Sequence, residues 1–129
     1  MRHTYGSSAG YLLNPSGYIK HGEMPYDALK REILEETGVE IRPTGLLAVR
    51  CSKKDWWLIF LAKYISGTPC SDNNENSEVL FLPFEEAINH PDITDTTKIL
   101  IRLAKEQKLL LVNDKYSALS WSDGRVMFS

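Results

Sequence analysis

Hydrophobic and polar residues alternate with a helical period between Pro25 and Gly38 of this 129-residue chain. Leu29 and Ile33 stand four positions apart among polar residues, which is the spacing of an apolar stripe on one face of a helix. Proline suits the first helical turn, where its missing N–H costs nothing, and glycine suits the position after the last turn. The pattern therefore predicts a helix that begins at Pro25 and ends before Gly38.

Three later segments are apolar enough to predict strands. Residues 44–51 are bounded by turn-forming residues, and residues 79–84 form a short strand that a proline ends. Residues 55–65 are aromatic, β-branched and almost continuously apolar, which is typical of a strand buried on both faces. Strands of this kind after a helix predict a mixed α/β chain.

The remaining segments predict two further helical pieces and an extended tail. Residues 84–90 fit a brief helical turn, and residues 94–108 have the spacing of an amphipathic helix with a Thr or Asp cap. The side chains predicted to face inward from this second helix are Ile99, Leu100 and Leu103. Residues 109–129 alternate short apolar runs with turn signals. Because no linker or repeat separates these segments, we expect a single α/β domain over residues 1–129.

Composition and charge exclude several classes of function. A net charge of −2 gives no basic field to draw the chain onto nucleic acid or an anionic membrane, and no apolar run approaches the roughly 20 residues that cross a bilayer. The N-terminal residues lack the apolar core of a signal peptide, and Cys51 and Cys70 have neither the number nor the spacing of a disulfide framework or zinc site. We therefore expect a cytoplasmic protein that binds neither nucleic acid nor membranes.

The first predicted helix carries a concentration of acidic side chains. Glu32, Glu35 and Glu36 share one helix face, where like charges cost roughly a few tenths of a kcal/mol per pair. A divalent cation removes this cost, because hard cations such as Mg²⁺ take carboxylate oxygens as ligands. The preceding glycine-containing loop can bring Glu23 and backbone carbonyls to the same helix. The alternative interpretation is an ordinary solvated acidic face, partly neutralised by Lys30 and Arg31.

The whole spacing is more specific than the acids alone. Gly17 is followed after five residues by Glu23 and after seven more by the run from Arg31 to Val39, which reads Arg-Glu-Ile-Leu-Glu-Glu-Thr-Gly-Val. This arrangement resembles the Nudix box, Gly-x5-Glu-x7-Arg-Glu-U-x-Glu-Glu-x-Gly-U, in which U is a bulky apolar residue. Every fixed position of the box is met between Gly17 and Val39.

The resemblance implies a fold, a reaction and a metal site. The fold would be an α/β/α sandwich around a mixed β-sheet. The protein would be a Nudix pyrophosphohydrolase that uses Mg²⁺ or Mn²⁺ to cleave a pyrophosphate linkage in a nucleoside diphosphate linked to another moiety. The implied metal ligands are three box carboxylates and one backbone carbonyl, from Glu32, Glu35, Glu36 and Ser16. Arg31 would orient Glu32 and pair near Glu23.

Other candidate site residues lie outside the box. The resemblance leaves the general base open between a box glutamate such as Glu32 and a later one, Glu75 or Glu78, and it makes Glu75 a candidate metal ligand. For both later glutamates the alternative is a solvated acidic loop. The resemblance also makes Arg2 a candidate for contacting a substrate phosphate.

Two adjacent aromatic residues are a further candidate for substrate binding. Trp56 and Trp57 have side chains suited to stacking on a nucleobase, but on a strand neighbouring side chains point to opposite faces. We therefore expect one of them in the core and the other in a pocket or an interface.

The sequence departs from the family pattern at its front, where only 15 residues precede Ser16 and the usual strands are missing. An uncovered sheet edge would expose unpaired backbone groups, so we expect residues 109–129, or the same region of a second subunit in a homodimer, to pair with the sheet. A Nudix-fold binding or regulatory module without turnover, or a structural subunit, remains an alternative to the enzyme. The nucleotide-type substrate stays open among nucleotide sugars, ADP-ribose, dinucleoside polyphosphates and oxidised nucleoside triphosphates.

Overall fold

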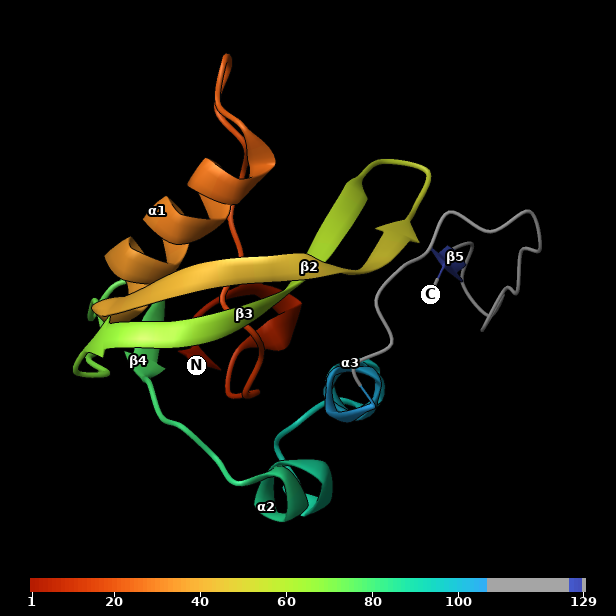
Figure 1. The fold of residues 1–129 in the computed structure, drawn as a ribbon. Coiled ribbons are helices and arrows are strands. Elements are labelled where there is room, and N and C mark those ends of the chain that lie inside the picture. Colours follow the sequence, from red (N-terminus) through yellow and green to blue (C-terminus); the bar gives the residue numbers. More distant parts are fainter. Residues whose placement is uncertain (107–125, 129) are drawn as a thin grey trace.

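Figure 1 traces the chain in a computed structural model, which describes residues 1–106 and the backbone of residues 126–128. The elements follow the order β1 (Arg2–His3), η1 (Gly6–Ser8), α1 (Pro25–Thr37), β2 (Val39–Cys51), β3 (Trp56–Gly67), β4 (Asn76–Glu78), α2 (Phe84–Asn89), α3 (Asp95–Lys105) and β5 (Val126–Phe128). The predicted α/β class is confirmed.

Helix α1 has the predicted limits. Pro25 occupies its first turn, and the preceding Met24 is extended and caps the helix with no side-chain hydrogen bond. Gly38 ends the helix with a left-handed backbone (φ 68°), which costs glycine little, and its N–H donates to the carbonyl of Leu34 at 2.9 Å. This turn sends the chain directly from the acidic end of α1 into β2.

Strands β2 and β3 form a long antiparallel hairpin, whose register runs from Val39 opposite Gly67 to Cys51 opposite Trp56. β2 therefore begins five residues before the predicted start at residue 44. Its ladder shifts register at three places, and one of them lies at Pro43, which has no N–H to donate to a neighbouring strand. The long hairpin gives α1 a surface on which to pack (Figure 1).

The expectation that residues 55–65 are buried on both faces is wrong. Trp56 is 76% exposed, and Tyr64 and Ile65 are also exposed. Within the described residues β3 pairs with β2 alone, at one edge of the order β3-β2-β5. An edge strand has one neighbour instead of two, so an apolar composition does not ensure burial there.

The strand predicted at residues 79–84 is also wrong, because the strand of this region lies earlier, at β4. β4 pairs antiparallel with β1, which brings the first residues of the chain against Asn76 and Glu78. Leu80 and Leu82 instead pack against a buried cluster of Leu12, Ala87 and Ile93. Their apolar character therefore serves packing around α2 and not a ladder.

Both later helices form, but α3 ends at Lys105, short of the predicted limit at residue 108, and residues 107 and 108 lie outside the described residues. Thr94 caps α3, and its side chain accepts a hydrogen bond from the N–H of Thr97. Leu100 is buried as expected and Leu103 is partly buried, but Ile99 is 42% exposed, so its inward assignment is wrong. Ile101, and not Ile99, completes the apolar stripe of α3, because it packs against the buried cluster of Leu12, Ala87 and Ile93.

Figure 1 shows α1 on one face of the β2–β3 hairpin and α2 and α3 beyond the other face. The three described ladders, β1–β4, β2–β3 and β2–β5, are all antiparallel, and a parallel contact occurs as an isolated bridge between Leu12 and Ile93. β5 pairs with the Val49–Cys51 end of β2, so the prediction that the tail joins the sheet is confirmed for residues 126–128. The rest of that prediction, residues 109–125 and 129, lies outside the described residues. Among the helices described, none has the length and apolar character needed to span a bilayer.

Candidate functional site

The loop before α1 folds back onto the helix, and Gly17 makes this approach possible. A Cβ atom built at Gly17 would overlap the side chain of Glu32, with the carboxyl carbon nearest. The first glycine of the motif is therefore needed for space rather than for an unusual backbone angle. It lets the loop backbone lie directly against the first of the three box glutamates.

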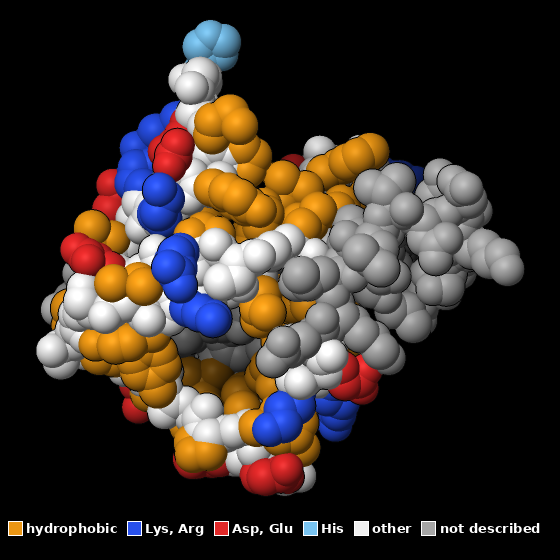
Figure 2. Space-filling view, in the orientation of Figure 1, with side chains coloured by type: hydrophobic (Ala, Val, Ile, Leu, Met, Phe, Trp, Pro, Cys, Tyr) orange, Lys and Arg blue, Asp and Glu red, His pale blue; other side chains and the backbone are white. Residues whose placement is uncertain are grey.

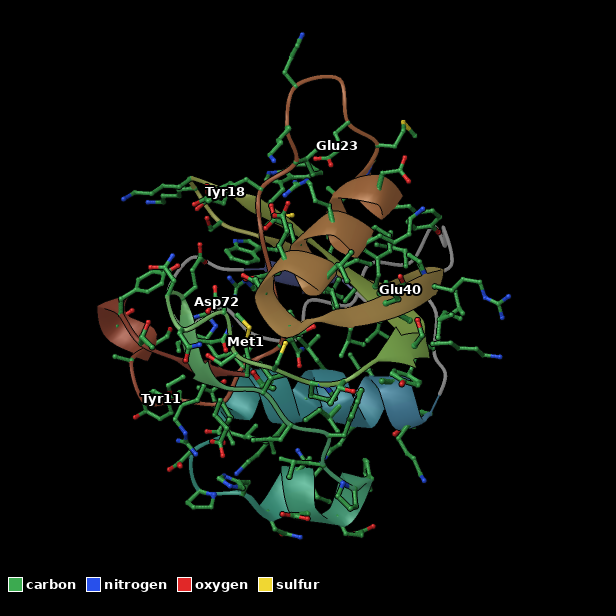
Figure 3. The ribbon with its side chains drawn as sticks, turned by 90° about the vertical axis from the view of Figure 1, so that its left-hand side faces the viewer. Met1, Tyr11, Tyr18, Glu23, Glu40 and Asp72 are labelled. Carbon is green, nitrogen blue, oxygen red and sulfur yellow. The ribbon has the colours of Figure 1, made fainter. Side chains whose placement is uncertain are left out.

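Arg31 joins this loop to the acidic helix face. Its guanidinium donates to five oxygens, namely Glu23 Oε1 (2.9 Å), Glu23 Oε2 (2.9 Å), Glu32 Oε1 (2.6 Å), Glu35 Oε2 (3.2 Å) and the carbonyl of Tyr18 (3.1 Å). The predicted pairing with Glu23 and Glu32 is confirmed. Figure 3 shows Glu23 and Tyr18 on the loop beside the first turns of α1. Hydrogen bonding to Arg31 lowers the pKa of Glu23 to about 2.

Glu36 is the buried member of the box, with 5% of its surface exposed. Its Oε2 accepts a hydrogen bond from the backbone N–H of Ser16 at 3.2 Å, so residue 16 lies at this carboxylate. Burial raises the pKa of Glu36 to about 7, and the nearby carboxylates of Glu75, Glu32 and Asp72 add to this effect against the Ser16 hydrogen bond. Negative charge is therefore concentrated around Glu36.

The loop before β4 supplies the additional carboxylate, Glu75. Tyr5 donates its O–H to Glu75 Oε2 at 3.1 Å. Asp72 Oδ1 accepts the backbone N–H groups of Asn74 (3.0 Å), Glu75 (3.1 Å) and Asn76 (3.1 Å), so one carboxylate shapes the whole loop. Desolvation opposes ionisation of Asp72, but these hydrogen bonds prevail and lower its pKa. In Figure 3 Asp72 lies near the last turn of α1.

Asn76 fastens this loop to the box helix. The side chain is fully buried, and its Nδ2 donates to the backbone carbonyl of Glu36 at 2.8 Å. Ser71 donates its hydroxyl to the carbonyl of Asn76 at 2.6 Å, which closes the loop from the other side. The position of Glu75 relative to Glu36 is thus set by buried hydrogen bonds at the last turn of α1.

Glu78 and Arg2 pair with each other, and among the described residues no hydrogen bond or ion pair joins either side chain to the box. Arg2 Nε donates to Glu78 Oε2 at 2.9 Å, and Arg2 Nη1 donates to Asp92 Oδ2 at 2.8 Å and to the carbonyl of Gly10 at 2.7 Å. These contacts hold β1, β4 and the segment before α3 together. Of the two later glutamates, Glu75 is therefore the one that approaches Glu36.

Two hollows adjoin these residues. A cavity of about 970 Å³ lies between the β2–β3 hairpin and α3, and Leu47, Ile59 and Leu100 line part of it. Figure 2 shows hydrophobic side chains around a hollow on this face of the molecule. A smaller cleft of about 280 Å³ lies beside the box loop and reaches Gly17 and Glu32.

Comparison with known proteins agrees with the site. A family model described as "NUDIX domain" matches residues 1–104, which is most of the chain. This chain belongs to the Nudix family. It is similar to "Nudix hydrolase 2" of Arabidopsis thaliana, with 31% identity over 83 residues, and to "Nudix hydrolase 6" of the same organism, with 31% identity over 84 residues. Each alignment covers 60% of this chain and 30% of the relative, so the chain spans about a third of the length of these proteins.

The acidic residues of this Nudix domain suit a divalent cation by their chemistry. The donors are carboxylate oxygens, which hard cations prefer. Burial is the main cause of the raised pKa of Glu36, and the neighbouring carboxylates that add to it are charges that a cation would neutralise. Among the described residues, no three His, Cys, Asp or Glu side chains are gathered as a metal-binding group. Glu32 and Glu35 point their oxygens at Arg31 instead, so metal binding would require these two carboxylates to turn.

Sequence reasoning missed three residues that shape this site, namely Tyr5, Asp72 and Asn76. Asp72 and Asn76 had a signal, because aspartate and asparagine in a polar run favour side-chain contacts with nearby backbone groups. Their placement at the end of α1 brings them to Glu36, which lies 36 positions from Asp72 and 40 from Asn76 in the sequence. Tyr5 carried no such signal.

Proposed function

We propose that this Nudix domain hydrolyses a pyrophosphate linkage in a nucleoside diphosphate linked to another moiety, with Mg²⁺ or Mn²⁺ as its cofactor. The observation that carries the proposal is the approach of a second acidic loop to the box. Glu75, on that loop, contributes to the raised pKa of buried Glu36, although the two lie 39 positions apart in the sequence. On a helix face that is acidic only because it is solvated, a further carboxylate nearby would add repulsion without any compensating cation.

The proposed metal ligands are the carboxylates of Glu32, Glu35, Glu36 and Glu75 and the backbone carbonyl of Ser16. Bound there, the cation would neutralise the pyrophosphate and lower the pKa of a water molecule. Arg31 pairs with Glu32 and Glu35, and its contacts with Glu23 fix the loop that carries Ser16.

The general base remains a choice between Glu32 and Glu75. Both lie among the acids that raise the pKa of Glu36. Glu78 is excluded from this role in the proposal because its carboxylate pairs with Arg2 at 2.9 Å. We likewise assign the guanidinium of Arg2 to the fold, and leave phosphate binding by Arg2 out of the proposal.

The decisive test is Glu36→Gln, which keeps the shape of the side chain and removes its charge. We expect Mg²⁺ affinity and Mg²⁺-dependent cleavage to fall together, with a rate loss on the order of a thousandfold, or about 4 kcal/mol in the barrier. The matched control is Glu85→Gln, which removes one exposed carboxylate on α2. Calorimetry and product identification with nucleotide sugars, ADP-ribose, dinucleoside polyphosphates and oxidised nucleoside triphosphates measure both effects. Equal affinity and rate in the two variants would overturn the proposal.

One observation favours the alternative, a Nudix-fold binding or regulatory module without turnover. The ion pairs of Glu32 and Glu35 with Arg31 leave the box carboxylates ungathered. This alternative expects nucleotide binding in the same calorimetric titrations with no product formed from any of the substrates. Product formation that requires Mg²⁺ decides against it.

Location and assembly complete the proposal. We place the protein in a reducing cytoplasm, because Cys51 and Cys70, the chain's two cysteines, are both free thiols. The assembly proposed is a homodimer in which the sheet edges of the two subunits pair. The mass of the protein in native solution tests it.

A further inference from the structure

The smaller cleft is lined both by a residue of the predicted metal site and by aromatic side chains. It lies between the box loop, the first turns of α1 and the start of β3, and it has a volume of about 280 Å³. Gly17 and Glu32 line the cleft from the box loop and α1, and Trp56, Trp57 and Phe60 line it from β3. One small hollow therefore places an acidic group of the Nudix box next to three aromatic rings.

The two tryptophans have different surroundings within this cleft. Trp57 is 38% exposed, and the guanidinium carbon of Arg50 lies 4.9 Å from the centre of its ring. This cation–π contact holds Trp57 in place from the neighbouring strand. Trp56 keeps 76% of its surface exposed. The expectation that one of the pair lies in the core is therefore wrong, since both reach the cleft.

Exposure of this size is unusual for tryptophan, because burying its large apolar surface is more favourable in free energy than burying that of a smaller side chain. Phe60 does not share the exposure, since Tyr26 packs edge-on against it with ring centres 5.0 Å apart. Trp56 is therefore, of the three aromatic side chains that β3 gives to this cleft, the one most open to a ligand.

We propose that the planar ring of the substrate, a nucleobase, stacks on Trp56 while the attached phosphates extend toward Glu32. The inference rests on the proposed function, which it deepens by naming the part of the substrate that fills this cleft. A nucleotide unites a flat aromatic base with phosphates that a carboxylate-bound cation attracts, so it suits both the aromatic and the acidic lining of the cleft. The volume is at the lower end of the range for small-molecule pockets, so it accommodates one ring system rather than a whole dinucleotide.

The test compares two probes that differ by the base alone, AMP and ribose 5-phosphate, titrated calorimetrically into the full chain with Mg²⁺. We expect AMP to bind about tenfold more tightly, because stacking of a base on an aromatic side chain is worth roughly that much. Trp56→Ala should remove the preference and leave ribose 5-phosphate binding unchanged. Trp56→Phe should retain most of it.

Ile65→Ala is the matched control, since Ile65 is an exposed apolar residue on the same strand and does not line the cleft. It should leave the preference for AMP intact, and the melting temperatures of all variants should agree. Equal binding of AMP and ribose 5-phosphate to the wild type, or an undiminished preference in Trp56→Ala, would overturn the inference. If AMP is preferred but no nucleotide substrate is cleaved, the stacking site stands and the proposed hydrolase activity fails.

Discussion

The side-chain amide of Asn76 donates a hydrogen bond to the backbone carbonyl of Glu36 at 2.8 Å, inside the protein, where neither group reaches water. This bond joins the loop that carries Glu75 to the last turn of the box helix. Carbonyls in the last turn of a helix lack a partner within the helix, so Asn76 supplies one that the helix cannot.

Asn76→Ala should therefore reduce the free energy of unfolding by about 2 kcal/mol, because it leaves a buried carbonyl without a donor. It should also weaken Mg²⁺ binding, since the loop of Glu75 loses its attachment to α1. Urea denaturation and calorimetry measure the two effects. Asn89→Ala is the matched control, because the amide of Asn89 also donates to a carbonyl at 2.8 Å but is exposed. Equal losses in the two variants would contradict the prediction.

Gly17→Ala should disturb the site although it adds one methyl group. The new Cβ would overlap the Glu32 side chain, so either the loop or the carboxylate must move. We expect a loss of stability of about 1–3 kcal/mol, typical of overpacking, together with weaker metal binding. Gly10→Ala serves as control for an added methyl group without a steric clash, because no atom lies near its Cβ position, although its positive φ adds strain. A Gly17→Ala protein with unchanged metal affinity would show that the close approach is unimportant.

Arg31→Lys should not be a conservative change. The guanidinium contacts both oxygens of Glu23 and also reaches Glu32 and Glu35, whereas an ammonium group cannot reproduce this fork. We expect the loop to loosen, turnover to fall at least tenfold, and Glu23 to regain a higher pKa. Titration of Glu23 by NMR detects the last effect. Arg42→Lys, at an exposed position of β2, should change none of these quantities.

The metal-free protein should lose stability as the pH rises from 5 to 8. Burial holds the pKa of Glu36 at about 7, above its ordinary value of 4.5, so the folded state binds the proton more tightly than the unfolded state. Ionising Glu36 above pH 7 then costs up to about 3 kcal/mol of folding free energy. Glu36→Gln should match the wild type near pH 5 and exceed it at pH 8, as measured by urea denaturation with a chelator. A difference that does not change with pH would contradict the assignment.

The sequence by itself determined the local structure of the box. Pro25 and Gly38 set the limits of α1 through backbone geometry that each residue carries with it, and the spacing of Arg31 and Glu32 follows from the helix. The pairing of Arg31 with Glu23 could also be predicted, because the motif fixes the length of the loop between them. Short-range rules suffice wherever the partners are close in the chain.

Tertiary structure decided which residues meet from far apart. The sequence offered both Glu75 and Glu78 as the general base, and the pairing of β1 with β4 assigned Glu78 to Arg2. The apolar run of β3 predicted burial, yet its place at the edge of the described strands left Trp56 in the open. Composition sets how much a side chain gains from burial, but the neighbours that the fold supplies decide whether it is buried, and those neighbours come from distant parts of the chain.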